Sequence, residues 1–179
     1  MLKPDMTTVV FIDVQGRLAE AMADREALFA ALSKLLRGAT ELGLPVLWTE
    51  QIPEKLGPTT PELAVLLPGG TPIPKQSFSC CGAPEFVRRL EETGRRQVLL
   101  CGIEAPVCVQ QTARDLLDEG YEVEIAADAV SARSRGNKEI ALARLRDEGA
   151  GITCVEMALM ELLQEAGGDR FRAILKIIK

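Results

Sequence analysis

The chain has no histidine among its 179 residues. Its absence removes the usual base for a serine or cysteine nucleophile, the commonest zinc ligand, and the one side chain that ordinarily titrates near neutral pH. Any acid–base or nucleophilic chemistry must therefore rely on cysteine, aspartate, glutamate and lysine.

Other features are also scarce. The five cysteines are an odd number without CxxC spacing, which indicates neither a disulfide framework nor a zinc knuckle. No apolar run approaches the length of a membrane span, and the first one is too short for a secretory signal. A net charge of -5 gives no general attraction to phosphate backbones. We therefore expect a cytoplasmic protein with a small-molecule substrate, and neither nucleic acid nor a membrane as partner.

What is present fits a single domain spanning residues 1–179. Apolar residues make up 47% of the chain, and at this length about 70% of the unfolded surface is buried on folding, enough for a core without staples. Short β-branched runs alternate with helical patterns, which predicts an α/β fold with a mainly parallel sheet and helices on both sides. Strands are expected at 7–13, 44–49, 71–75, 97–101, 121–127 and 151–154, and helices at 25–42, 84–93, 106–119, 137–148, 156–165 and 169–179.

The segment 50–72 is rich in proline and glycine, which predicts a loop with at most one short helix, near 62–67. The final segment, 169–179, has apolar residues on one face and basic residues on the other. Such a helix can lie on a membrane surface, pack on its own domain, or pack on a second subunit.

Ligands of parallel α/β sheets bind outside the carboxyl ends of the strands. Asp13 ends the first predicted strand, Lys75 ends the third, and Cys108 opens the helix after the fourth. We expect an acid, a cation and a thiol to meet at this edge.

Cys108 is the third helical residue if Pro106 is the first. The helix start favours a thiolate there, although a buried structural cysteine fits the same position. Asp13 has the alternatives of a general base or the N-cap of a helix near Gly16. Lys75, in an extended segment stiffened by prolines, is either a partner of those anions or a solvated surface lysine.

Residues close to the strand ends are candidates for contact with a substrate. The polar ones could equally satisfy backbone groups, and the aromatic ones could belong to the core. The candidates are Gln15, Trp48, Gln51, Phe78 and Val107. The adjacent Cys80 and Cys81 are interpreted as structural.

Three segments resemble the signature blocks of the isochorismatase-like cysteine hydrolases, and most closely those of the isochorismatase domain-containing group. They are VVFIDVQ, PIPKQSF and LLCGIEAPVCVQQTARDLLDEGYEVEIAADAVSARS. The resemblance covers essentially the whole chain and implies a three-layer α/β/α sandwich with a six-stranded, Rossmann-like sheet. It also implies a catalytic triad of Asp13, Lys75 and Cys108, no cofactor, and a dimer or tetramer.

The same resemblance implies a cis peptide bond between Ile103 and Glu104, and an oxyanion hole made by the amides of Glu104 and Cys108. Lys75 would keep the charges of Asp13 and Cys108 compatible and could orient a leaving group. Many relatives carry a polar residue where this chain has Pro106, so a hydrogen bond from that position to substrate is not expected.

Two branches of the family are disfavoured by the residues present. Nicotinamidases use histidine ligands to a metal, and residues 50–74 contain none; some isochorismatases proper lack the cysteine that is present here as Cys108. The function expected is a metal-independent cysteine hydrolase that cleaves an amide, ureido or related C–N bond through a thioester. A catalytically silent binding or scaffold protein and a thiol redox sensor are the alternatives.

Overall fold

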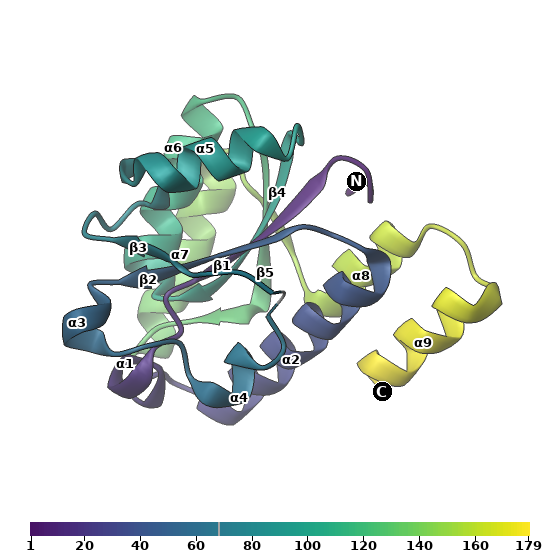
Figure 1. Ribbon diagram of the computed structural model, residues 1–179, viewed down its shortest axis with the longest axis horizontal. Helices are drawn as coiled ribbons and strands as arrows, with labels where there is room; N and C mark the ends of the chain where they lie inside the picture. Colours follow the sequence, from purple (N-terminus) through teal and green to yellow (C-terminus); the bar gives the residue numbers. More distant parts are fainter. Residues whose placement is uncertain (68) are drawn as a thin grey trace.

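The computed structural model describes residues 1–67 and 69–179. Pro68, within the predicted loop 50–72, lies outside the described residues. The chain forms a six-stranded sheet between two layers of helices (Figure 1).

All described strand pairs are parallel, in the order β3-β2-β1-β4-β5-β6. The predicted α/β class with a parallel six-stranded sheet is confirmed. The two central strands, β1 and β4, are buried along their whole length, which explains their nearly continuous apolar sequences. The strands are β1 (Thr7–Ile12), β2 (Val46–Gln51), β3 (Ile73–Lys75), β4 (Gln97–Ile103), β5 (Glu122–Ser131) and β6 (Gly151–Thr153).

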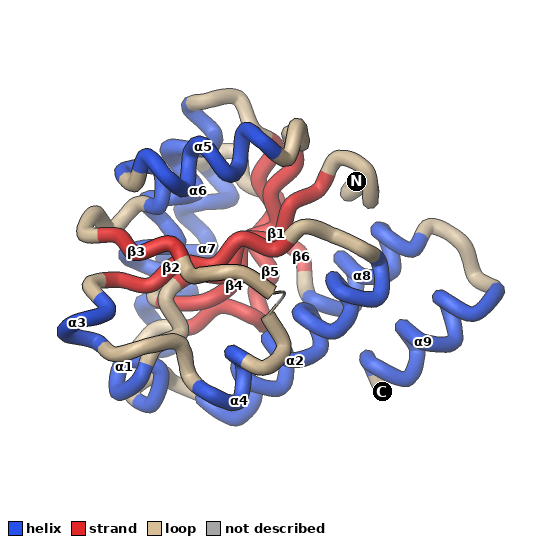
Figure 2. The backbone as a smooth tube through the Cα atoms, viewed as in Figure 1, coloured by secondary structure: helices blue, strands red, loops and turns tan. Residues whose placement is uncertain are grey.

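Helices cover both faces of this sheet (Figure 2). One layer contains α2 (Arg25–Leu42) and α8 (Val155–Leu163), both of which contact β5. The other contains α5 (Pro84–Glu92), α6 (Gln110–Asp118) and α7 (Arg135–Asp147). Short helical segments lie between these elements: α1 (Gly16–Glu20), α3 (Pro53–Leu56), α4 (Pro61–Ala64), η1 (Cys80–Gly82) and η2 (Ala105–Val109).

Alternation along β1 divides the core into two clusters. Val9 and Phe11 point into the cluster beneath α2 and α8, whereas Val10 and Ile12 point into the cluster beneath α5 and α6. Each cluster contains apolar side chains from several strands, so the sheet is a continuous wall between two apolar layers.

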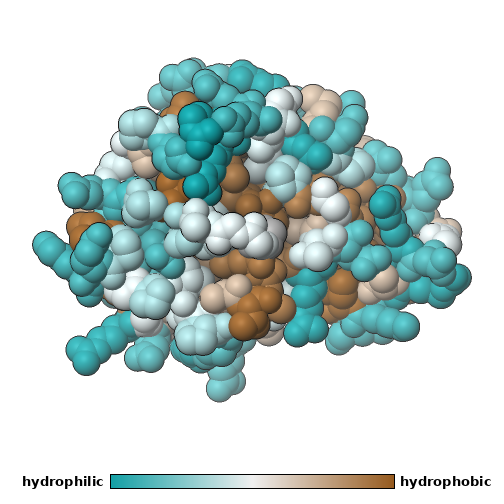
Figure 3. All heavy atoms as spheres, viewed as in Figure 1, coloured by the Kyte–Doolittle hydropathy of each residue, from teal (hydrophilic) through white to brown (hydrophobic). Residues whose placement is uncertain are grey.

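Helix α9 (Gly168–Ile178) packs on α2 and α8 and buries Ile174, so its apolar face is used within the domain. Figure 3 shows polar side chains over much of the visible face, with apolar side chains gathered in the lower middle. In the part of the chain that the structure describes, no helix is both long and apolar enough to cross a membrane.

The structure corrects several predicted boundaries. The strands predicted to end at residues 49, 101 and 127 extend to Gln51, Ile103 and Ser131. The loop 50–72 contains α3 as well as α4, because Pro53 and Pro61 each occupy an early position of a short helix. The helix predicted at 106–119 begins one residue earlier, as a π-helical turn over Ala105–Val109 that precedes α6.

Gly102 lies on β4 and is paired with Ile12 of β1. Its φ is +110°, and a Cβ atom there would lie 2.2 Å from the Ile12 carbonyl oxygen and 2.6 Å from the Ile12 nitrogen. The contact is with backbone in the middle of the sheet, which cannot move aside as a flexible side chain can. Only glycine fits this crossing without strain.

We expect Gly102→Ala to lower the free energy of unfolding by about 2 kcal/mol or more, because overpacking adds to the cost of a positive φ. Gly149→Ala is the matched control, since Gly149 has a φ of +103° but a Cβ atom there would have no neighbour within 4 Å. Urea unfolding should therefore show a clearly smaller loss for the control. Equal losses in the two variants would contradict the steric argument.

Candidate active site

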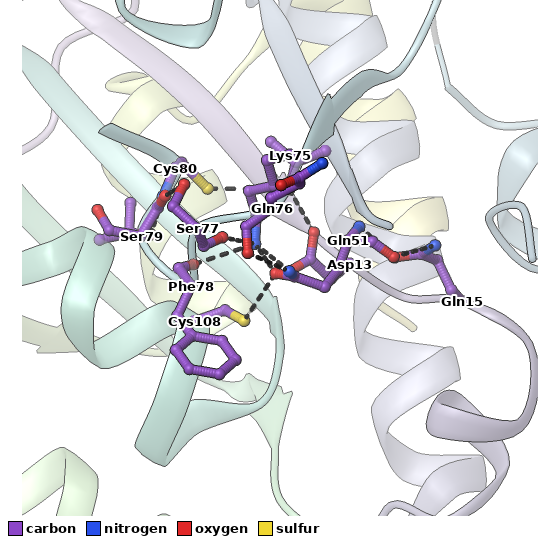
Figure 4. Close-up of polar contacts among 12 residues, drawn as sticks. Asp13, Gln15, Gln51, Lys75, Gln76, Ser77, Phe78, Ser79, Cys80 and Cys108 are labelled. Carbon is purple, nitrogen blue, oxygen red and sulfur yellow. Dashed lines mark hydrogen bonds and ion pairs between the residues drawn. The ribbon is translucent and has the colours of Figure 1, made fainter. Parts of the chain in front are cut away.

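A buried ion pair lies at the carboxyl edge of the sheet. Asp13 follows β1 and Lys75 ends β3, and Lys75 Nζ is 2.6 Å from Asp13 Oδ2 with both side chains fully buried (Figure 4). The two strands concerned lie on either side of β2, which separates β1 from β3 in the sheet. The strand order thus brings together residues that are 62 positions apart in the sequence (75 minus 13).

The second oxygen of Asp13 is also bound. Thr49 Oγ1 donates to Asp13 Oδ1 at 2.7 Å, from the position on β2 that is paired with Ile12. The alternative of Asp13 as an N-cap is wrong, because Gln15 occupies the N-cap of α1 and makes no side-chain capping bond. Asp13 itself has a φ of 51°, a conformation that aspartate tolerates better than most residues.

Lys75 is surrounded by acceptors. Besides the Asp13 carboxylate, its Nζ donates to Gln51 Oε1 at 2.6 Å and to the carbonyl oxygens of Ser77 and Phe78 at 3.1 and 3.0 Å. Four acceptors share the three protons of this ammonium group. The lysine is therefore not a solvated surface residue, and no proton is left over to orient a leaving group.

Cys108 lies on η2, at the start of the helix that follows β4, and its side chain is buried. Its thiol donates a long hydrogen bond to Gln51 Oε1, with the sulfur 3.8 Å from the oxygen. Because η2 begins at Ala105, Cys108 is the fourth helical residue and Pro106 the second, one position later than predicted for each.

Burial, and then the negative charge of Asp13, raises the pKa of the Cys108 thiol to about 12, against the opposing effect of Lys75. The expectation of a thiolate favoured by the helix start is therefore wrong for the unliganded site. Cys108 is a protonated thiol at neutral pH, so its use as a nucleophile requires a base.

Sequence reasoning missed two members of this group, Thr49 and Cys80. Cys80 Sγ is 3.8 Å from Thr49 Oγ1, and the Cys80 amide donates to Thr112 Oγ1 at 2.9 Å. Burial, and then the Asp13 charge, raises the pKa of Cys80 to about 12. Thr49 could have been found from its place near the end of a strand neighbouring Asp13, whereas the packing of η1, which carries Cys80, against α6 has no clear sequence signal.

The five candidate substrate contacts are placed differently from one another. Gln51 lies between Lys75 and Cys108, whereas Gln15 is fully buried and binds backbone groups of Gln51 and Gly57. For Gln15 the structure thus favours the alternative of backbone satisfaction.

Two of the remaining candidates lie close in the fold to Cys108, and one does not. The Phe78 ring is 54% exposed at the Cys108 end of the group, and Val107 is a partly buried neighbour on η2 (Figure 4). Trp48 does not join them: it belongs to the core cluster beneath α2 and α8, on the opposite face of the sheet from Cys108. The reason is that alternate β2 side chains point to opposite faces.

The peptide bond between Ile103 and Glu104 is cis. The Glu104 side chain points toward the β5–α7 connection, where its Oε2 pairs with Arg133 Nε at 3.0 Å. The Glu104 carbonyl oxygen accepts from the amides of Val107 and Val109, which fixes the chain at the start of η2.

A cleft of about 480 Å³ lies elsewhere, between α2, β5 and α8, and none of its lining residues belongs to the group around Asp13. We therefore base the candidate site on the buried polar group rather than on this cleft. Within residues 1–67 and 69–179, no cluster of three or more His, Cys, Asp or Glu side chains is arranged to hold a metal ion.

Comparison with known proteins identifies the family. Residues 7–157 match the family model described as Isochorismatase domain. The chain belongs to the isochorismatase family. Isochorismatase domain-containing protein 2A of Mus musculus is 37% identical over 177 residues, which cover 98% of this chain and 84% of the mouse protein. The resemblance seen in the sequence blocks is confirmed.

Solved structures agree with this assignment. MAR1 ribonuclease from Caenorhabditis elegans is 32% identical with a TM-score of 0.92, covering 99% of this chain and 91% of that one. YcaC from Pseudomonas aeruginosa, solved with hexane-2,5-diol and covalent acrylamide, is 25% identical with a TM-score of 0.92, covering 98% and 90%. YcaC from Escherichia coli, described as an octameric hydrolase of unknown specificity, is 22% identical with a TM-score of 0.93, and the match covers 99% of this chain and 88% of that one. At this identity the similarity is one of fold.

The buried ion pair makes a prediction about stability. Lys75→Met leaves Asp13 as an uncompensated buried charge, and we expect it to lower the free energy of unfolding at pH 7 by about 3–5 kcal/mol. The double variant Asp13→Asn, Lys75→Met has no such charge and should be more stable than Lys75→Met alone. Urea unfolding of the four proteins in this cycle measures the coupling. A double variant whose loss equals the sum of the two single losses would contradict the ion pair.

The buried thiols make a second prediction, about alkaline pH. Burial raises the pKa of Cys101 and of Cys108 in the folded chain, so above pH 9 the folded state binds more protons than the unfolded state. Stability should therefore fall as pH rises, by at most about 1.4 kcal/mol per pH unit for each such thiol.

Cys101→Ala isolates one thiol, because Cys101 has burial as the sole cause of its raised pKa. Urea unfolding under reducing conditions at pH 7.5 and pH 10 should show a smaller difference between the two pH values for this variant than for the unmodified chain. An unchanged difference would mean that the Cys101 thiol ionises as easily folded as unfolded.

Proposed function

We propose that this isochorismatase-family protein is a metal-independent cysteine hydrolase that cleaves an amide, ureido or related C–N bond of a small molecule. The observation that carries the proposal is the Cys108 thiol beside the fully buried Asp13–Lys75 ion pair, within one hydrogen-bonded group. Cysteine attack on a carbonyl carbon requires a base, and histidine, the usual one, is absent from the chain. The carboxylate of Asp13 takes that place.

In the proposed first step, Cys108 attacks the carbonyl carbon while Asp13 accepts the thiol proton. A carbon–sulfur bond forms, and the tetrahedral intermediate carries its negative charge on the former carbonyl oxygen. When the C–N bond breaks, the nitrogen takes the proton from Asp13 and leaves as an amine, so that a thioester remains on Cys108.

In the proposed second step, Asp13 removes a proton from water as the water oxygen attacks the thioester. The carbon–sulfur bond breaks, and the proton returns from Asp13 to the sulfur of Cys108. The sum is substrate plus water giving a carboxylic or carbamic acid plus an amine. No cofactor enters the balance.

The amides of Glu104 and Cys108 are the proposed donors to the oxyanion. Both belong to the turn where β4 meets η2, at the positive end of the helical segment. Two preorganised amide donors are a sufficient oxyanion hole in acyl transfer, and their removal costs catalysis rather than binding.

The relatives support two further parts of the proposal. Pseudomonas aeruginosa YcaC carries covalent acrylamide, which fits a fold that can present a nucleophile to a small electrophile. Escherichia coli YcaC is described as octameric, and we propose that this chain also forms a homo-oligomer, with a dimer or tetramer as the expected size.

The proposed function predicts that small amides release amine only when Cys108 is present. A panel of amides and ureas should include at least one that the unmodified chain hydrolyses, and Cys108→Ala should abolish this turnover. Asp13→Asn should slow it by about 100-fold or more, as loss of a general base does. Amine release measured by chromatography, together with intact mass for the thioester, checks both effects.

Cys101→Ala is the control for the loss of a buried thiol, because Cys101 lies within β4 and outside the group around Asp13. It should retain turnover. Turnover that persists in Cys108→Ala would rule out the cysteine mechanism.

Absence of turnover across the panel would instead favour a catalytically silent binding or scaffold protein. A reversible sulfenic acid or mixed disulfide at Cys108 after mild peroxide, coupled to altered partner binding, would favour a thiol redox sensor.

A further inference from the structure

The Gln51 carboxamide lies between the cation and the thiol of the site. Its Oε1 accepts from Lys75 Nζ at 2.6 Å and is the oxygen toward which the Cys108 thiol points, with the sulfur 3.8 Å away (Figure 4). One neutral oxygen thus contacts both partners of Asp13. Gln51 is buried, as are these three residues.

The orientation of this carboxamide is fixed by its other end. Gln51 Nε2 donates to the carbonyl oxygen of Gln76 at 2.8 Å. A flipped amide would turn its NH₂ group toward the Lys75 ammonium and its oxygen toward another oxygen, so both ends disfavour the flip. The oxygen therefore faces Lys75 and Cys108.

The backbone of Gln51 is held in turn by Gln15. The Gln51 amide donates to Gln15 Oε1 at 2.7 Å, and Gln15 Nε2 donates to the carbonyl oxygens of Gln51 and Gly57 at 3.3 and 2.6 Å. Gln15 lies beyond the end of β1, and its side chain binds the backbone at the end of β2 as a paired strand would. It contacts neither Lys75 nor Cys108 through any of these bonds.

We propose that Gln51 is a positioning residue for the cysteine chemistry, whose oriented oxygen holds Lys75 against Asp13 and keeps the Cys108 thiol protonated beside that carboxylate. The inference rests on the proposed function and deepens it, and it replaces the expected role of Gln51 in contacting substrate. Gln15 holds the backbone of Gln51 in place through its side-chain hydrogen bonds.

The charge at this position sets the expected effect on Cys108. The titratable and charged groups that face Cys108 are Asp13, Lys75 and Cys80. Gln51→Glu keeps the size but places a second carboxylate on Lys75 and beside the sulfur, which raises the pKa of the thiol. Gln51→Met keeps the approximate size but removes the acceptor oxygen that binds Lys75. The Lys75 charge then stabilises the thiolate of Cys108 more strongly, which lowers the pKa of the thiol.

The experiment measures the rate at which iodoacetamide alkylates Cys108 between pH 6 and pH 10, resolved by peptide mass spectrometry. At pH 7.5 we expect Gln51→Glu to react about tenfold more slowly than the unmodified chain, the effect of one pKa unit, with its profile moved to higher pH. Gln51→Met should move the profile to lower pH and react about threefold faster at pH 7.5, a shift of about half a unit.

Gln111→Glu makes the same chemical change at an exposed position of α6 and should leave the profile unchanged. Thermal unfolding of each variant shows that it is folded at the temperature of labelling. If Gln51→Met unfolds, the Gln51→Glu profile alone decides, since a loss of packing at Gln51 would expose Cys108 and would not slow its labelling across this pH range.

The outcomes separate this inference from the proposed function. Profiles that do not move, or that move in the same direction in both variants, would overturn the positioning role of Gln51 while leaving the cysteine mechanism intact. If Asp13→Asn does not slow amine release from a substrate that the unmodified chain hydrolyses, the proposed base is wrong, and the proposed function fails irrespective of Gln51.

Discussion

The ion pair between Asp13 and Lys75 is the constraint around which this edge of the sheet is built. Two opposite charges without access to water are tolerable only when their geometry is good and their remaining valences are satisfied. The chain meets that requirement with Thr49 on the carboxylate and with Gln51 and two backbone carbonyls on the ammonium. The ends of β1, β2 and β3 are therefore fixed relative to one another by electrostatics as well as by strand pairing.

That rigidity bears on the chemistry proposed for the cysteine. Cys108 on its own is a buried thiol with a pKa raised to about 12, indistinguishable in that respect from Cys80, whose pKa is raised to the same value. What distinguishes the two is position: Cys108 opens a helix at the end of β4, whereas Cys80 lies in a short turn held to Thr112. A thiol near a fixed carboxylate at a helix start has both a proton acceptor and nearby amide donors, which are the two things that acyl transfer requires.

Much of the fold could be predicted from the sequence, because parallel strands that are buried on both faces leave continuous apolar runs and glycines mark the helix ends. The meeting of Asp13, Lys75 and Cys108 followed from strand ends alone. The orientation of Trp48 could not be predicted in this way. A shift of one residue along a strand moves a side chain to the opposite face of the sheet, and no local signal fixes that position near a strand end. The raised pKa of Cys108 could not be predicted either, because the sequence pattern shows that a helix starts there but does not show how deeply the thiol is buried. The carbonyl oxygens of Ser77 and Phe78 that bind Lys75 depend on how the PIPKQSF segment turns back, which is a tertiary property.

The strand order has a further consequence. Every residue of the group around Asp13 comes from β2, β3 or the short segments that follow β1, β3 and β4, so the candidate site occupies one half of the sheet. Strands β5 and β6, with α7, α8 and α9, form the other half and supply none of the side chains of that group. Substitutions in this second half can therefore change the outer surface, and with it the contacts made with other molecules, while the side chains of the candidate site stay the same.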